Sequence, residues 1–306
     1  MGTLIGHVGP GFGFLLIGLW HLFNHIKLFS LHPKSYRSLP WFPFPKLRYL
    51  ELLLIAIGSC ISIAMELFIG PESHQPLDHD LTIPSNHLHN FEHASISLTF
   101  LLYSAFAVIF DLARPARPAA EPLTILAASA AFAQQLFLFH LHSSDHMGVE
   151  GQYHSLLQLV IAVSLITTIM GISHPRSFAV GFARSTSTAL QGIWFVVMGY
   201  ALWTPGLIPK GCFMNQEEGH TVVRCRSEEA LQRAKSLVNI EFSWILAAVV
   251  ASSLLFYLVF SRRYAVEAEY LKAGGEDDES EDFDLESEKR SFVSLEREMR
   301  NIDLER

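Results

Sequence analysis

The chain has 306 residues, half of them hydrophobic and only 17% charged, with a formal net charge of −8. The apolar residues lie in long blocks, which excludes a soluble globular domain, and nothing in the composition indicates nucleic-acid binding. A helix needs about 20 apolar residues to cross a hydrocarbon core roughly 30 Å thick, and blocks of this length recur along the chain. We therefore predict an integral membrane protein, whose first partner is the lipid bilayer.

Seven apolar segments are long enough to be transmembrane helices. Backbone polar groups find no water partners in lipid, so each span should be α-helical and the spans should pack together. The predicted fold is all-α, a polytopic membrane bundle of seven transmembrane helices over residues 1–262. The spans cover about residues 8–29, 49–70, 91–113, 122–142, 153–173, 188–208 and 240–261.

The first span begins with the stretch GPGFGFLLIG, in which Gly9 and Gly13 have the small-residue spacing of a close helix contact. We expect these glycines to allow close packing, and they imply no phosphate-binding loop.

The distribution of Lys and Arg predicts the orientation, because these residues favour the cytoplasmic side of a membrane. The loops after the first, third and fifth spans and the segment after the seventh are basic, whereas residues 71–90 and 143–152 contain no Lys or Arg. This pattern puts the N-terminus outside or in a lumen and the C-terminus in the cytoplasm, without indicating which membrane holds the protein.

The loop over residues 209–239 should lie outside although it carries five basic residues. It also holds Cys212 and Cys225, close enough in sequence to form a disulfide in an oxidising compartment. We weigh this pair in favour of the outside placement. The alternative is two unpaired surface thiols.

Histidines gather in two segments that this topology brings to the outer face. HLHNFEH, at the start of the third span, holds His87, His89, Glu92 and His93. HLHSSDHMGVEGQYH spans the turn between the fourth and fifth spans and holds His140, His142, His146, Glu150 and His154. Glu66 and Glu241 should lie at similar depth, and intramembrane carboxylates are costly unless they are paired or functional.

Several imidazoles and carboxylates at one depth predict a transition-metal site, with zinc as the first choice. The expected ligands are His93, His142, His146 and His154, with His89 and His140 beside them. In an enzyme, bound metal would activate water towards a lipid or small substrate, with Glu150 or Glu92 as the base. The alternatives are proton-linked or pH-sensing histidines, histidines that only decorate the membrane interface, and a haem site as the weakest choice. A non-enzymatic metal or proton transporter, or a membrane scaffold, is the rival function.

A second polar group lies at the inner ends of the spans: His21, Asn24, His25, Glu51 and His174. These residues are more scattered, so we expect capping, interhelical hydrogen bonds and snorkelling rather than a second site.

The tail over residues 263–306 carries almost all of the net negative charge. Its core, GGEDDESEDFDLESE, is too acidic and too poor in apolar residues to fold alone, so we predict a disordered cytoplasmic segment. Such a tail could bind a cytosolic partner, although a solvating tail is the simpler interpretation. The sequence predicts no oligomeric state.

The pattern GHxxPGxxFxxxGLWH, read at Gly6, His7, Pro10, Gly11, Phe14, Gly18, Leu19, Trp20 and His21, and the run FHxHxxxHxxxExxxH, starting at Phe139, carry a resemblance. With the Glu92–His93 pair, they are similar to the transmembrane protein 45 family, a family of unknown function, and the loop lengths and acidic tail look like those of its plant members. The resemblance covers about residues 1–262. It implies a multi-pass membrane protein and brings no established reaction.

Overall fold

The computed structural model describes residues 3–70, 75–113, 119–141, 148–217 and 220–273, and these are mostly helical. By internal contacts the chain divides into two compact units, Met1–Ser261 and Arg262–Arg306. The bundle belongs to the first unit. The tail that we predict to be disordered lies outside the described residues from residue 274 onward.

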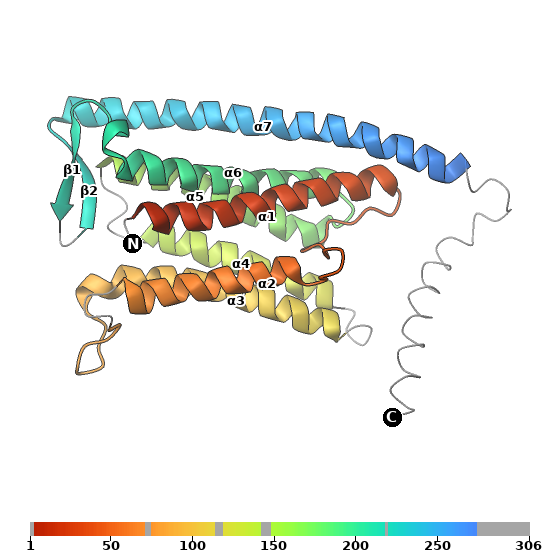
Figure 1. Ribbon diagram of the computed structural model, residues 1–306, viewed down its shortest axis with the longest axis horizontal. Coiled ribbons are helices and arrows are strands. Elements are labelled where there is room, and N and C mark those ends of the chain that lie inside the picture. Colours follow the sequence, from red (N-terminus) through yellow and green to blue (C-terminus); the bar gives the residue numbers. More distant parts are fainter. Residues whose placement is uncertain (1–2, 71–74, 114–118, 142–147, 218–219, 274–306) are drawn as a thin grey trace. The chain divides into compact units, whose positions relative to one another are not determined.

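The described part of the chain consists mainly of seven long α-helices (Figure 1). Loops, short 3-10 and π-helical turns and one pair of strands lie between them. The helices are α1 (Leu4–Leu31), α2 (Leu50–Ala64), α3 (Leu88–Leu112), α4 (Ala120–Leu141), α5 (Gly148–Ser173), α6 (Phe178–Trp203) and α7 (Glu228–Ala273). The short turns are Met65–Ile69, Ser85–His87 and Pro205–Leu207.

Six of these helices are long and apolar enough to cross a membrane, which supports a membrane-embedded protein. The exception is α6, so the prediction of seven spans is confirmed only in part. The helix begins at Phe178, ten residues before the predicted span, and its interior carries polar side chains such as Arg184, Ser187, Thr188 and Gln191. Those side chains are buried against neighbouring helices, so α6 needs less apolar surface than a helix that faces lipid.

Neighbouring helices pack in the order α2, α3, α4, α5, α6, α1. The closest contact is between α1 and α6. A Cβ atom added at Gly18 would lie 2.4 Å from the Ala189 backbone nitrogen, and one at Gly192 would lie 2.3 Å from the Leu15 nitrogen. The sequence suggested Gly9 and Gly13 for close packing. A Cβ atom added at either of them would have no atom of the described structure within 4 Å. That prediction was wrong because the contact face of α1 runs through Gly11 and Gly18 instead.

The connection between α6 and α7 is not the irregular loop that an all-α prediction implies. Strands β1 (Cys212–Glu217) and β2 (His220–Cys225) form an antiparallel hairpin in which Cys212 pairs with Cys225. The two cysteines are joined by a disulfide, as the sequence predicted. After the hairpin α7 begins at Glu228, twelve residues before the predicted seventh span.

The hairpin packs on the start of α5. Val223 of β2 is buried in the same apolar cluster as Val149 of α5 and Val238 of α7. Gly148 starts α5 with a φ of +66°, a conformation that favours glycine, and a Cβ atom added there would lie 3.4 Å from the Val223 carbonyl oxygen. We call this end of the bundle, where Leu4, Ile69, Leu88, Leu141, Gly148 and Trp203 lie, the hairpin end.

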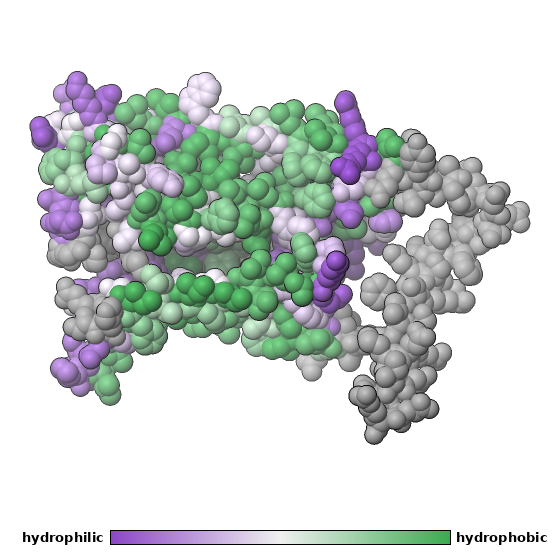
Figure 2. All heavy atoms as spheres, in the orientation of Figure 1, coloured by the Kyte–Doolittle hydropathy of each residue, from purple (hydrophilic) through white to green (hydrophobic). Residues whose placement is uncertain are grey.

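Apolar side chains cover the outer faces of the helices, and hydrophilic residues gather towards the two ends (Figure 2). Large exposed hydrophobic residues include Ile57 on α2, Leu102 on α3 and Trp244 on α7. A surface of this kind would aggregate in water, whereas lipid covers it at no cost.

Candidate functional site

Two histidines from helices far apart in sequence meet at the hairpin end. His7 of α1 and His154 of α5 are 8% and 3% exposed, and their ring centroids lie 5.8 Å apart. Trp203, the last residue of α6, stacks on His7 with ring centroids 4.5 Å apart. Three helices therefore hold this pair in an aromatic setting.

The two imidazoles share one hydrogen-bonding arrangement. Nδ1 of His7 lies 3.0 Å from the Thr3 carbonyl oxygen, and Nδ1 of His154 lies 3.0 Å from the Glu150 carbonyl oxygen. A carbonyl can only accept, so each Nδ1 carries the proton and each Nε2 has the lone pair. Histidines that bind metals usually have this arrangement, because a carbonyl partner on one nitrogen fixes the tautomer that ligates through the other.

A carboxylate lies beside the third histidine of this region. His93 of α3 is within 3.5 Å of the Glu66 carboxylate, which also accepts a 2.8 Å hydrogen bond from the Asn90 side chain. Glu66 lies in the π-helical turn that ends α2 and is 6% exposed. Such turns often occur at functional sites, because the extra residue re-aims a side chain.

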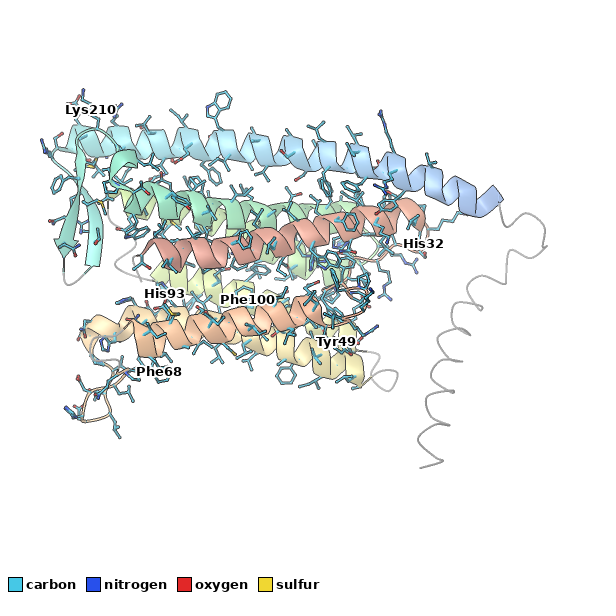
Figure 3. All side chains as sticks on the ribbon, viewed as in Figure 1. His32, Tyr49, Phe68, His93, Phe100 and Lys210 are labelled. Carbon is cyan, nitrogen blue, oxygen red and sulfur yellow. A yellow bond between two sulfur atoms is a disulfide. The ribbon has the colours of Figure 1, made fainter. Side chains whose placement is uncertain are left out.

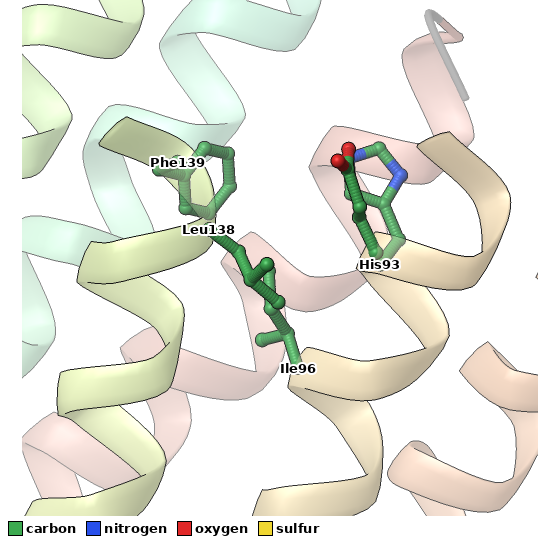
Figure 4. A pocket seen from close by; sticks show the side chains of 5 residues that line it. His93, Ile96, Leu138 and Phe139 are labelled. Carbon is green, nitrogen blue, oxygen red and sulfur yellow. The ribbon is translucent and has the colours of Figure 1, made fainter. Parts of the chain in front are cut away.

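Phe139 of α4 contacts both His93 and His154, with ring centroids 6.5 Å and 5.7 Å away. A small hollow lies next to it, too small to admit a water molecule, and is lined by Glu92, His93, Ile96, Leu138 and Phe139 (Figure 4). Figure 4 shows His93 and Phe139 on opposite sides of this hollow, on α3 and α4. Phe139 therefore links the histidine of α3 to the histidine of α5.

The other predicted site residues take different positions. His89 lies 6.3 Å from His93 between ring centroids, while His140 is exposed and its Nδ1 lies 3.3 Å from the Gln158 side-chain oxygen. Glu150 is partly exposed in the first turn of α5. His142 and His146 fall outside the described residues. Among those that are described, no three His, Cys, Asp or Glu side chains are close enough to hold a metal ion.

Two histidines of this region were not among the predicted ligands. His7 appeared only in a family motif, although the predicted topology already put it at the depth of His93 and His154. His87 is 7% exposed, and neither of its ring nitrogens has a hydrogen-bond partner within the described segments. A buried imidazole without a hydrogen-bond partner is uncommon in native proteins.

Charged residues of the hairpin lie at the same end. Arg224 donates an Nε hydrogen bond of 2.8 Å to Glu217, and this guanidinium lowers the pKa of the Glu217 carboxyl. Glu150, at the start of α5, contributes to the raised pKa of Arg224, after the larger effect of Glu217. These charges link β2 electrostatically to the helix that carries His154.

At the opposite end, polar groups form a closed network. The Glu51 carboxylate accepts hydrogen bonds from His21 Nε2 at 2.7 Å, the Trp20 indole at 3.1 Å and the Phe42 amide at 2.9 Å. The expected interhelical hydrogen bonds are therefore confirmed for His21 and Glu51. Asn24 bonds to the Trp20 carbonyl of its own helix.

His25 belongs to the same network through partners that the sequence did not reveal. Arg184 donates to His25 Nε2 at 3.2 Å and also to the Leu39 carbonyl. Because Arg can only donate, the His25 proton is on Nδ1, which lies 2.9 Å from the Tyr36 hydroxyl. These hydrogen bonds hold the loop between α1 and α2 against His25 of α1 and Arg184 of α6. His174 is exposed and bonds to Ser173 instead.

Residues 121–258 match the profile of the Family of unknown function (DUF716). The match runs from the start of α4 through most of α7 and includes Glu150, His154 and the disulfide hairpin. A domain of this family is thus found in the chain, and the family brings no assigned reaction.

Proposed function

We propose that this chain is a multi-pass membrane protein that binds a transition metal, zinc as the first choice, at the hairpin end of its bundle. The observation that carries the proposal is the His7–His154 pair. Both imidazoles are buried, 5.8 Å apart, and have Nδ1 committed to a backbone carbonyl. Two neutral imidazoles with that tautomer are suitable ligands for zinc.

His142 and His146 would complete the coordination shell, since the chain passes from His140 to Glu150 directly before His154. A structural or catalytic zinc needs three or four protein ligands, and the described pair supplies two of them. His93 stays a candidate if its side chain moves past Phe139 as metal binds. His89 and His140 are the outer candidates of the same group.

A metal here would suit hydrolysis or oxidation of a lipid or another small substrate. His7 and His154 would hold such a metal, which would make a water molecule more acidic and so supply a nucleophile for hydrolysis. Glu92 lines the hollow beside His93, and Glu150 lies one turn before His154, so each is placed to act as the base. A metal or proton transporter and a membrane scaffold are the non-enzymatic alternatives.

One observation favours a second candidate function, a proton-linked switch. The His93–Glu66 contact of 3.5 Å would strengthen when the imidazole is protonated and would weaken when Glu66 is neutral. Such a protein would respond to pH without any metal, so metal analysis separates the two candidates.

We also propose that the hairpin end lies outside the cell or in a lumen. The Cys212–Cys225 disulfide supports this orientation, because disulfides persist in oxidising compartments. Membership of the transmembrane protein 45 family is proposed on the motifs at Gly6 to His21 and Phe139 to His154.

The metal proposal is tested with double variants of the full-length protein purified in detergent without chelators. His7→Ala with His154→Ala should lose Co²⁺ absorption bands and bound Zn²⁺. The matched control, His32→Ala with His174→Ala, changes two exposed histidines at the opposite end and should keep both. Figure 3 shows His32 and His93 at opposite ends of the bundle.

Affinity in the wild type should fall as the pH is lowered, because protons compete with the metal for the imidazole nitrogens. Equal metal content in the two double variants would defeat the assignment.

A further inference from the structure

A cavity of about 300 Å³ lies between α1, α6 and α7, at the middle of all three helices. Leu15, Leu19 and Leu22 line it from α1, Ala189 from α6, and Ala248 and Ser252 from α7. The lining residues of α7 run from Ile245 to Phe256, about three turns or roughly 16 Å along the helix. The cavity is thus a groove that follows the helix direction at the depth of the hydrocarbon core.

Aromatic contacts hold α7 on the bundle at both ends of this groove. Phe242 packs on Trp194 of α6 with ring centroids 4.9 Å apart, and Phe260 packs on Phe23 of α1 at 5.4 Å. Between these contacts, small side chains of α7 face Ala189. The small side chains of Ala248 and Ser252 thus leave space beside α1 that the aromatic contacts at the two ends do not fill.

The contents of the groove follow from its chemistry and its size. The atoms that line an empty void lack the van der Waals contacts of a packed interior. A groove that is open to its surroundings is therefore filled by the surrounding molecules. At this depth the surroundings are lipid acyl chains. A helix of a second copy does not fit, because a helix about 10 Å across and roughly 16 Å long occupies on the order of 1,200 Å³, several times the cavity.

We propose that this groove binds one acyl chain of a membrane phospholipid. The walls are aliphatic with few hydroxyl groups, so the groove recognises the hydrocarbon chain and leaves the headgroup at the membrane surface. A volume of about 300 Å³ is at the lower limit of the range of ligand pockets, roughly 300–1,000 Å³, and accepts a single chain rather than a whole lipid. The site is separate from the histidines and does not depend on metal binding.

The test uses full-length protein in phosphatidylcholine vesicles that contain a phospholipid with a photoactivatable group in the middle of one acyl chain. After irradiation, mass spectrometry maps the labelled residues. Labelling should concentrate on Leu15 to Leu22 and Ile245 to Phe256, well above the exposed residues Leu53, Leu54 and Ile57 of α2, which meet only bulk lipid.

Ala248→Phe should lower the labelling of Leu19 several-fold by filling the groove, whereas the control Leu54→Phe, on an exposed face of α2, should leave it unchanged. If Ala248→Phe does not fold, Ser252→Leu fills the groove one turn further along α7 and should have the same effect. Equal labelling of the groove and α2 would mean bulk lipid contact only and would overturn the proposal. So would cross-links between two copies through α7, or labelling by a free fatty acid probe without labelling by the phospholipid.

Discussion

Replacing Gly18 with Ala should destabilise the bundle by forcing α1 and α6 apart. The added Cβ would lie 2.4 Å from the Ala189 nitrogen and 2.7 Å from its Cα, about 1 Å inside the 3.4 Å at which ordinary contact begins. Both obstructing atoms belong to the backbone, so no side-chain rotation relieves the clash. Overpacking of this size typically costs about 1–3 kcal/mol.

The assay is thermal unfolding of the detergent-purified protein, followed by tryptophan fluorescence. At about 2 °C per kcal/mol for a chain of this size, the Gly18→Ala midpoint should fall by roughly 2–6 °C. The matched control is Gly13→Ala on the same helix, where an added Cβ has nothing within 4 Å. That variant should unfold at or above the wild-type temperature, since Ala favours helix over Gly by about 1 kcal/mol. Equal shifts for the two variants would refute the α1–α6 contact face.

Replacing Cys212 and Cys225 with Ser should lower the free energy of unfolding by about 2–4 kcal/mol, because the bridge restricts the unfolded chain across a sequence separation of 13 residues. The same loss should follow mild reduction of the wild type, and free thiols in the unreduced protein would count against the bridge. Burial raises the pKa of Tyr36 to about 12. The folded chain therefore keeps this proton after the unfolded chain has lost it near pH 10, and stability should fall from about pH 10 to pH 12. Tyr36→Phe should reduce that fall in unfolding measurements across this range, and an identical pH profile for both proteins would contradict the burial. A glycosylation acceptor in the loop between α2 and α3 should be modified, while a protease site placed after residue 275 should be cut from the cytosol. The reverse pattern would invert the orientation.

The helices were predictable because blocks of apolar residues report directly on the membrane, and six helices keep that composition. The limits of α6 were not predictable in this way. Arg184 and its neighbouring hydroxyl residues made the first part of the helix look like a loop, yet they are buried against other helices. Burial against protein does not leave an apolar signal in the sequence. The hairpin was missed for a similar reason, since its strands are short and mix apolar residues such as Phe213, Met214, Val222 and Val223 with polar ones.

At the candidate site, sequence identified His93 and His154 as residues of one membrane depth, but not their neighbours. The depth of a residue in the membrane follows from the order of the spans. The rotation of each helix about its own axis, which decides the neighbours of a side chain, depends on packing. That rotation brings His7 next to His154 and places Phe139 beside both His154 and His93. Tyr36 and Arg184 were missed because their partners lie far away in the sequence.

The metal content of wild-type protein, purified without chelators or affinity metals and measured by mass spectrometry of the elements, tests the central claim most directly. We predict about one zinc or other transition-metal ion per chain, the number that one histidine site holds. Protein that is folded by circular dichroism and yet carries no stoichiometric metal, even after dialysis against Zn²⁺, would contradict the claim and favour the metal-free, proton-linked alternative.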